Sequence, residues 1–329
     1  MQLINLSIDK SKINSYLSNS LLTKIKETLE KWEKVILYLN KRWQFNSLIC
    51  NDCQNLIKCK NCDISMSVHK YPAKLICHLC SYTDEIPIKC NKCNWNNLAK
   101  IWVWTQQIEE SLKYFYKNKH IFRFDTDTMK TKKSKTDALE VLNNSDIIIW
   151  TKMITTWFNF NKVWLIWIIL IEQELQIPKY NTEESVYTNI KQLIWRWWRV
   201  WQKTDFLIQS FIPDNEIIQS ILFSNYKEFF IKTLEERKLF SYPPFWEIAT
   251  IEFRAKSEEK SLDFMWKLKN KLDIELENNK IEVIFNKTTM KKFNQFYSKI
   301  VLKGENLRNT LEIIKPEIIR NSGLSITFD

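Results

Sequence analysis

Glycine is almost missing from this chain of 329 residues. It occurs twice, at Gly304 and Gly323, whereas the usual share of about 7% predicts roughly 23 glycines in this length. A chain with two glycines has few means of forming tight turns or bringing its backbone close to a ligand. Apolar runs of about 18 residues are also missing, which argues against a membrane-spanning helix. The first residues lack the basic and then apolar layout of a secretory signal, so we expect a soluble, intracellular protein.

Tryptophan is in excess where glycine is scarce, with 15 occurrences. A surface that stacks nucleic-acid bases would explain many tryptophans, but it would not explain the loss of glycine. Some bacterial lineages read the codon UGA as glycine, and translating such a gene with UGA as tryptophan would give this pattern. Adding the 15 tryptophans to the two glycines gives 17, a near-normal glycine count. We therefore interpret most tryptophans as glycines of the natural protein, foremost Trp102, Trp104, Trp150, Trp195, Trp197 and Trp198.

All eight cysteines lie between residues 50 and 93, in four Cys-x2-Cys motifs. The motifs are Cys50/Cys53, Cys59/Cys62, Cys77/Cys80 and Cys90/Cys93. Two thiolates at this spacing can share one tetrahedral metal, so four motifs predict two closed, structural zinc sites. Disulfides would need an oxidising compartment, and short paired motifs favour zinc over an iron–sulfur cluster. The first two motifs are too close in sequence to wrap around one ion, which leaves a crossed or a nested pairing.

Strands and helices alternate on both sides of the cysteines, which predicts an α/β domain with a parallel sheet. Apolar runs and helical spacing predict strands at 35–39, 101–103, 122–124, 146–149, 163–171 and 206–210, and helices at 20–33, 106–115 and 136–142. Ligands bind at the carboxyl ends of such strands. We expect the loops 150–158 and 195–201 to lie there.

The last third of the chain has a different pattern. Residues 216–240 are helical and charged, which is typical of a connector, and a Tyr-Pro-Pro-Phe segment ends it. Residues 247–329 then predict a small α+β domain with strands at 248–253, 281–285, 298–302 and 324–328, and helices at 258–272 and 305–319. The net charge of +11 favours a polyanionic partner.

One motif becomes readable when glycine replaces tryptophan. Residues 192–199 then read Q-x-x-G-R-x-G-R, which resembles motif VI of superfamily 2 helicases. Arginine suits this chemistry because its planar, permanently charged fork can stabilise charge on a transferring phosphoryl group. Two arginines on a solvated helix are the alternative interpretation.

The wider resemblance, from about residue 31 to the C-terminus, is to the PriA family of replication-restart helicases. The segments that carry it are LYLNKRWQ (37–44), the cysteine spacing, IWVWTQQIEESL (101–112), RFDTDT (123–128), IIIWTKMITTWFNF (147–160) and YPPFWEIA (242–249). The fifth segment resembles G-T-Q-M-x-x-K-G-x-x-F, with Lys152 and Thr156 at the family's Gln and Lys positions. Glu172 stands where the family usually has Asp, and Leu170 where many members have a second Asp.

The resemblance implies a fold, a domain order and a set of functional residues. It implies a RecA-like helicase lobe 2 with a two-zinc insertion, followed by a small α+β domain. The expected segments are the inter-lobe link and start of lobe 2 (1–49), the zinc insertion (50–93), the rest of lobe 2 (94–215), a helical connector (216–245) and the C-terminal domain (246–329). In the family the zinc pairing is nested: Cys50, Cys53, Cys90 and Cys93 hold one ion, and Cys59, Cys62, Cys77 and Cys80 hold the other. Arg199 is implied as the finger on the γ-phosphate and Arg196 as a supporting contact, while Gln192, Thr151, Thr155 and Thr156 couple nucleotide to DNA.

Neither the G-x-x-x-x-G-K-[ST] phosphate loop nor a D-E-x-H box occurs in the sequence, even with tryptophan read as glycine. We therefore expect the C-terminal half of an ATP-dependent 3′→5′ DNA helicase of replication restart, from a gene fragment or a split gene, acting in the bacterial cytoplasm. Such a chain alone should be inactive, because a lobe 1 normally holds ATP and Mg2+. The implied partners are forked and single-stranded DNA, the missing lobe 1 and N-terminal DNA-binding domain, single-stranded-DNA-binding protein and other primosome proteins. The alternative is a non-enzymatic, zinc-containing DNA-binding module.

Overall fold

The computed structural model describes the chain except residues 7, 10, 12–13, 15, 40–47, 51, 54, 62–64, 71–72, 78–81, 101–104, 125–139, 152–162, 176, 178, 199–203, 224, 277–279 and 293. The chain divides into two compact units. The first comprises residues 1–57, 87–177 and 181–229, and the second comprises residues 58–86, 178–180 and 230–329. No helix among the described residues is long and apolar enough to cross a membrane.

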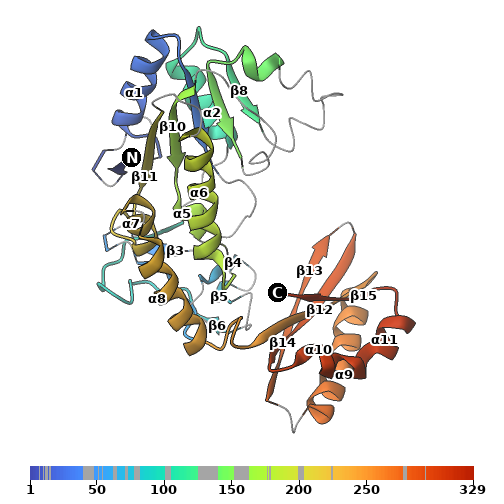
Figure 1. Cartoon of the computed structure of the whole chain (residues 1–329). Helices are drawn as coiled ribbons and strands as arrows, with labels where there is room; N and C mark the ends of the chain where they lie inside the picture. Colours follow the sequence, from blue (N-terminus) through green and yellow to red (C-terminus); the bar gives the residue numbers. More distant parts are fainter. Residues whose placement is uncertain are drawn as a thin grey trace. The chain divides into compact units, whose positions relative to one another are not determined.

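The first unit is built on a six-stranded parallel sheet (Figure 1). Its strands, in spatial order, are β1 (Gln2–Asn5), β11 (Asp205–Ser210), β10 (Val163–Ile169), β2 (Lys34–Tyr38), β9 (Ile147–Trp150) and β8 (Ile121–Phe124). Every neighbouring pair is parallel, which confirms the predicted parallel sheet. The edge strand β1 was not expected, because it is short and lies outside the alternating pattern of strands and helices.

Continuous apolar runs explain why the central strands lie in the middle of the sheet. In β9 every residue is buried, and in β2 and β10 all but one are. Strands buried on both faces are typical of parallel sheets covered by helices. The helices flanking the sheet are α1 (Asn19–Glu30), α2 (Thr105–Phe115), α5 (Glu172–Leu175), α6 (Thr182–Trp198) and α7 (Glu216–Phe223).

Helix α1 shows how the local sequence sets the ends of an element. It begins at Ser18, whose side-chain Oγ accepts a hydrogen bond from the backbone N–H of Leu21 at 3.0 Å. Such a cap satisfies one of the otherwise unpaired first N–H groups of the helix. Leu21, Ile25 and Leu29 then form the buried face of the helix. The predicted helix at 20–33 is thus confirmed, with its end three residues earlier.

The prediction that residues 195–201 form a loop at the carboxyl edge of the sheet is wrong for residues 195–198, which belong to helix α6. This helix connects the carboxyl end of β10 to the amino end of the parallel neighbour β11. Residues 195–198 form the last turn of this helix, so they lie toward the amino edge of the sheet rather than in a loop at its carboxyl edge. The printed sequence explains this, because tryptophan continues a helix, whereas each glycine would destabilise it by about 1 kcal/mol.

The cysteine-rich insertion forms two small antiparallel sheets. One pairs β3 (Leu48–Cys50) with β7 (Leu98–Lys100), and the other contains β4 (Ser67–Lys70), β5 (Ala73–Ile76) and β6 (Thr83–Asp84). The strand predicted at 101–103 and most of the helix predicted at 136–142 lie outside the described residues.

The C-terminal part confirms the predicted α+β domain. Its antiparallel sheet has the order β13 (Ile281–Lys292), β14 (Gln295–Gly304), β12 (Glu247–Ala255) and β15 (Leu324–Phe328). The accompanying helices are α9 (Glu258–Glu275), α10 (Leu307–Thr310), the 3-10 turn at Leu311–Ile314 and α11 (Lys315–Arg320). Met265, Leu268 and Leu272 of α9 are buried in a core with sheet residues such as Ile251 and Ile300. Helix α8 (Tyr226–Leu239) precedes this domain, within the predicted helical connector.

Candidate zinc centre

The cysteine motifs share one local turn. In the motifs that begin at Cys50, Cys77 and Cys90, the backbone N–H of the first cysteine donates to the carbonyl oxygen five residues later. These bonds are Cys50 to Asn55 at 3.0 Å, Cys77 to Tyr82 at 2.9 Å and Cys90 to Trp95 at 2.8 Å. A backbone that closes on itself in this way keeps the motif compact without help from the rest of the fold. The short spacing of each motif therefore determines a local turn.

Strand pairing brings the first and last motifs together. Cys50 is the last residue of β3 and pairs with Leu98 of β7, a few residues after Cys93. The Sγ atoms of Cys50 and Cys93 lie 3.5 Å apart, and those of Cys53 and Cys90 lie 3.4 Å apart. All four sulfur atoms lie within 4.8 Å of one another. The structure thus assembles the outer cysteine set that the family resemblance implies for one ion.

The assembled set fits a zinc ion. A Zn–S bond of about 2.3 Å places tetrahedral sulfurs about 3.8 Å apart, inside the span of these four atoms. The six cysteines that the structure describes are free thiols, and separations of 3.4–3.5 Å are far longer than a disulfide bond. Cys50 and Cys90 are buried, and no histidine or carboxylate joins the described cluster. Four thiolates and no open position match a structural site rather than a catalytic one.

The electrostatics of the four thiols show why a cation belongs here. Burial and the neighbouring thiols raise the pKa of Cys53 to about 12, even though the Asn55 backbone N–H opposes the shift. For Cys90 burial also favours the neutral thiol, but the backbone N–H groups of Cys93 and Lys92 reverse this and lower its pKa to about 7. One thiol therefore ionises near neutral pH while its neighbour resists. A divalent cation would supply the charge that allows all four to ionise.

The inner motifs are only partly described. Cys59 and Cys77 are buried, at 2% and 0% exposure, whereas Cys62 and Cys80 lie outside the described residues. A bridge between Lys58 and Ser65 and the β4–β5 hairpin bring this segment into a compact ribbon. The second zinc site therefore stays a prediction.

Of the residues expected to act on nucleotide and DNA, only Thr151 and Gln192 have described side chains. Thr151 directly follows β9, is buried, and donates its hydroxyl to the carbonyl oxygen of Phe124 at 3.3 Å. Gln192 is exposed on α6. Arg196 lies in the last turn of α6, but its side chain is outside the described part. Arg199, Lys152, Thr155 and Thr156 also lie outside the described residues.

Glu172 has a structural role that the sequence did not reveal. It is the first residue of α5, three residues after the end of β10, and it is completely buried. Its Oε1 accepts hydrogen bonds from the Ser210 hydroxyl and from the backbone N–H groups of Phe211 and Ile212, the last at 3.2 Å. The carboxyl group thus joins the carboxyl ends of β10 and β11. Burial raises its pKa, although these hydrogen bonds favour the ionised form.

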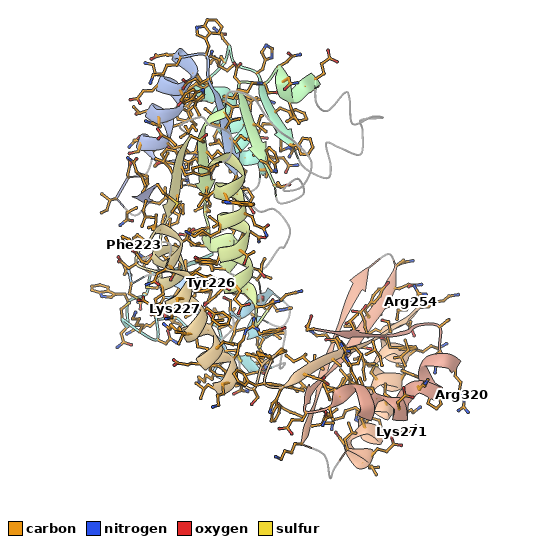
Figure 2. The ribbon with its side chains drawn as sticks, viewed as in Figure 1. Phe223, Tyr226, Lys227, Arg254, Lys271 and Arg320 are labelled. Atoms are coloured by element: carbon orange, nitrogen blue, oxygen red, sulfur yellow. The ribbon has the colours of Figure 1, made fainter. Side chains whose placement is uncertain are left out.

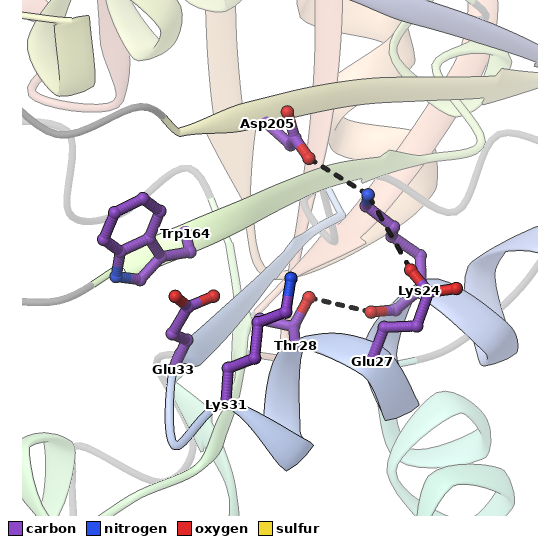
Figure 3. Close-up of a pocket in the computed structure, with 7 residues that line it drawn as sticks. All are labelled: Lys24, Glu27, Thr28, Lys31, Glu33, Trp164 and Asp205. Carbon is purple, nitrogen blue, oxygen red and sulfur yellow. Dashed lines mark hydrogen bonds and ion pairs between the residues drawn. The ribbon is translucent and has the colours of Figure 1, made fainter.

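A cavity of about 280 Å³ opens at the opposite, amino edge of the sheet (Figure 3). It is lined by Lys24, Glu27, Thr28, Lys31, Glu33, Trp164 and Asp205. The Nζ atom of Lys24 lies 3.2 Å from the Asp205 carboxylate and 3.9 Å from that of Glu27. Because both acids and lysines line the cavity, the lining indicates no single class of ligand.

Comparison with known proteins agrees with the cysteine-rich architecture. Residues 59–84 match the family model described as the PriA DNA helicase Cys-rich region (CRR) domain. The chain is 32% identical over 279 residues to replication restart protein PriA of Chlamydia pneumoniae, covering 84% of this chain and 37% of that protein. It is 31% identical over 261 residues to PriA of Borreliella burgdorferi, covering 79% and 39%, and 29% identical over 239 residues to PriA of Bacillus subtilis, covering 72% and 30%. The chain therefore spans 30–39% of the length of these three curated relatives.

Proposed function

We propose that this chain supplies the C-terminal portion of an ATP-dependent 3′→5′ DNA helicase. The reason is its similarity to the PriA replication restart proteins along most of its length. The observation that carries this proposal is the 32% identity over 84% of the chain, which includes the cysteine-rich region. The activity belongs to an assembly that also contains a phosphate loop and an acidic box, since the printed sequence has neither. In that assembly the chain would act on forked and single-stranded DNA in the bacterial cytoplasm.

The proposed roles of the cysteines are structural. Cys50, Cys53, Cys90 and Cys93 would hold one zinc ion, and Cys59, Cys62, Cys77 and Cys80 a second. The sulfur geometry of the outer set supports the first ion, and the match of residues 59–84 to the family's Cys-rich region supports the second. Closed four-cysteine sites supply folding free energy to a segment too small to build its own core.

The proposed roles of the polar residues follow from phosphoryl-transfer chemistry. Arg199 would stabilise charge on the γ-phosphate and Arg196 would support it, while Gln192, Thr151, Thr155 and Thr156 couple nucleotide to DNA. Such groups act only when the β/γ-phosphates and Mg2+ are already positioned, which is the task of a lobe 1. The chain alone should therefore not hydrolyse ATP.

An ATPase assay with single-stranded DNA tests this proposal. The zinc-loaded chain is assayed alone and then fused to a lobe 1 taken from one of the PriA relatives. We expect no turnover by the chain alone and DNA-stimulated turnover by the fusion. Arg199→Ala in the fusion should reduce the rate by about 10³–10⁵-fold, as in phosphoryl-transfer enzymes that lose an arginine finger. Turnover by the isolated chain would overturn the two-lobe argument, and an unaffected Arg199→Ala fusion would remove the motif VI assignment.

A second candidate is a non-enzymatic, zinc-containing DNA-binding module. It is favoured by the lack of a phosphate loop and D-E-x-H box in the printed sequence. The same fusion distinguishes the two: a fusion that binds DNA and holds zinc, yet never hydrolyses ATP, would favour the module.

A further inference from the structure

Two aromatic rings and a lysine project from the junction of α7 and α8 (Figure 2). Phe223, the last residue of α7, is 77% exposed, and Tyr226, the first residue of α8, is 58% exposed. Lys227 follows directly, is exposed, and forms no ion pair with any residue that the structure describes. Two large exposed rings only three residues apart in the sequence are typical of a surface that binds a ligand or partner.

The backbone under these rings is held from several directions. The Tyr187 ring of α6 stacks on Phe229 with centroids 4.7 Å apart, and Tyr226 packs against Tyr187 at 5.7 Å. The Lys191 ammonium of α6 donates to the carbonyl oxygen of Ile221 at 2.7 Å, which fixes the end of α7. A surface held in place in this way loses little conformational entropy when it binds.

We propose that Phe223, Tyr226 and Lys227, which we call the junction surface, bind single-stranded DNA. The two rings would stack on successive bases, and the Lys227 ammonium would pair with a phosphate between them. Every base has an aromatic face, so such stacking tolerates any sequence. The inference rests on the proposed function for the presence of DNA, and it adds the place on the chain where the strand is held.

Charge distinguishes this occupant from a protein partner. The cores of protein–protein interfaces are depleted of lysine, because a buried ammonium must be desolvated. The junction surface instead contains an exposed lysine next to Tyr226 in the sequence, in a chain whose formal charge of +11 becomes about +7 once two zinc ions are each held by four thiolates. The acidic neighbour Glu228 is also exposed. Two rings with an adjacent cation match the combination that single-strand-binding proteins use.

Fluorescence anisotropy with a labelled 15-nucleotide oligothymidylate tests the proposal, using the full zinc-loaded chain. Phe223→Ala should weaken binding by roughly 5- to 150-fold, which is the usual effect of removing one stacking ring. Phe223→Leu should weaken it nearly as much, because leucine keeps the apolar surface but offers no ring, whereas Phe223→Tyr should bind like the unchanged chain. Lys227→Gln should lower the slope of log affinity against log salt by about 0.7. The matched control is Tyr114→Ala, which removes a tyrosine of α2 that is 66% exposed.

The possible outcomes separate this inference from the function it rests on. If the unchanged chain binds the oligonucleotide and all junction variants bind equally well, the junction surface is wrong and the proposed function stands. If Phe223→Leu retains binding while Phe223→Ala loses it, the surface is an apolar docking site and base stacking is refuted. If the unchanged chain binds no DNA, both the inference and its premise are overturned. Thermal melting of each variant establishes that a loss of binding is not a loss of folding, and Phe223→Tyr must then restore binding.

Discussion

Trp32 occupies a backbone position that tests whether the printed tryptophans are natural. It follows α1 with a φ of 59°, in the left-handed region. The backbone N–H of Trp32 donates to the carbonyl oxygen of Leu29 at 3.2 Å, and the backbone N–H of Glu33 donates to the carbonyl oxygen of Thr28 at 3.2 Å. These two bonds form the Schellman ending of a helix, in which the left-handed residue is usually glycine. We predict that Trp32→Gly gives a more stable chain than Trp32→Ala.

The magnitude follows from what the substitution changes. A residue with a Cβ pays about 1–2 kcal/mol in the left-handed region, and glycine avoids this cost. The greater conformational freedom of glycine in the unfolded chain reduces this gain in free energy of unfolding by about 0.4–1 kcal/mol. The indole is 88% exposed, and its described contact is the Lys119 ammonium 5.6 Å from the ring, which is worth about 0.5–1 kcal/mol. Because Trp32→Ala loses the same contact, Trp32→Gly should exceed Trp32→Ala by about 1 kcal/mol in free energy of unfolding.

Urea unfolding of the zinc-loaded chain, followed by circular dichroism, measures this difference. Trp266 provides a control of opposite sign, because it is exposed in the middle of α9, where glycine costs about 1 kcal/mol relative to alanine. Trp266→Gly should therefore be less stable than Trp266→Ala. A Trp32→Gly chain no more stable than Trp32→Ala would refute the backbone argument. It would also remove the structural support for a natural glycine at this position.

Three further predictions concern composition, metal and pH. Mass spectra of peptides from the protein's own source organism should show glycine across residues 195–198 and at most other tryptophan positions, and tryptophan throughout that segment would contradict the recoding. Metal analysis should find two zinc ions per chain, and Cys90→Ser should lower this to one; fewer than two in the unchanged chain, or iron instead, would refute the two closed sites. Burial raises the pKa of Glu172 above its ordinary 4.5, so the folded state holds this proton more tightly and stability should fall as pH rises from about 4.5 through the folded-state pKa. Glu172→Gln should reduce this fall in denaturation experiments, and an identical pH profile would show that Glu172 does not cause it.

Much of the fold was predictable because it depends on local features of the sequence. The runs of β2, β9 and β10 are apolar without interruption, so burial on both faces was their simplest interpretation. Helix α1 could be predicted from a single apolar face. The cysteine motifs are also local, since the motifs at Cys50, Cys77 and Cys90 each form a turn closed by a hydrogen bond from the first cysteine's N–H to the carbonyl oxygen five residues later.

The surroundings of individual tryptophans could not be predicted from the sequence. At Trp164 the register of β10 against β2 shifts, which marks an irregularity of a kind where glycine is common in strands. The Trp167 side chain is fully buried, and its Nε1 finds no hydrogen-bond partner among the described residues, although a buried indole usually has one. Composition led us to interpret tryptophan as glycine, but the positions where tryptophan fits poorly become visible only when the backbone is folded.

The sequence by itself determined which residues can bind metal and which segments must be buried, because both depend on residue type and short spacing. Tertiary structure decided which elements meet. The outer cysteines share one site because β3 pairs with β7 across the whole insertion, and Glu172 joins two strand ends because β10 and β11 are neighbours. It also placed residues 195–198 on α6, because a crossover between parallel strands must return to the amino edge. These juxtapositions depend on long-range pairing, which no local pattern encodes.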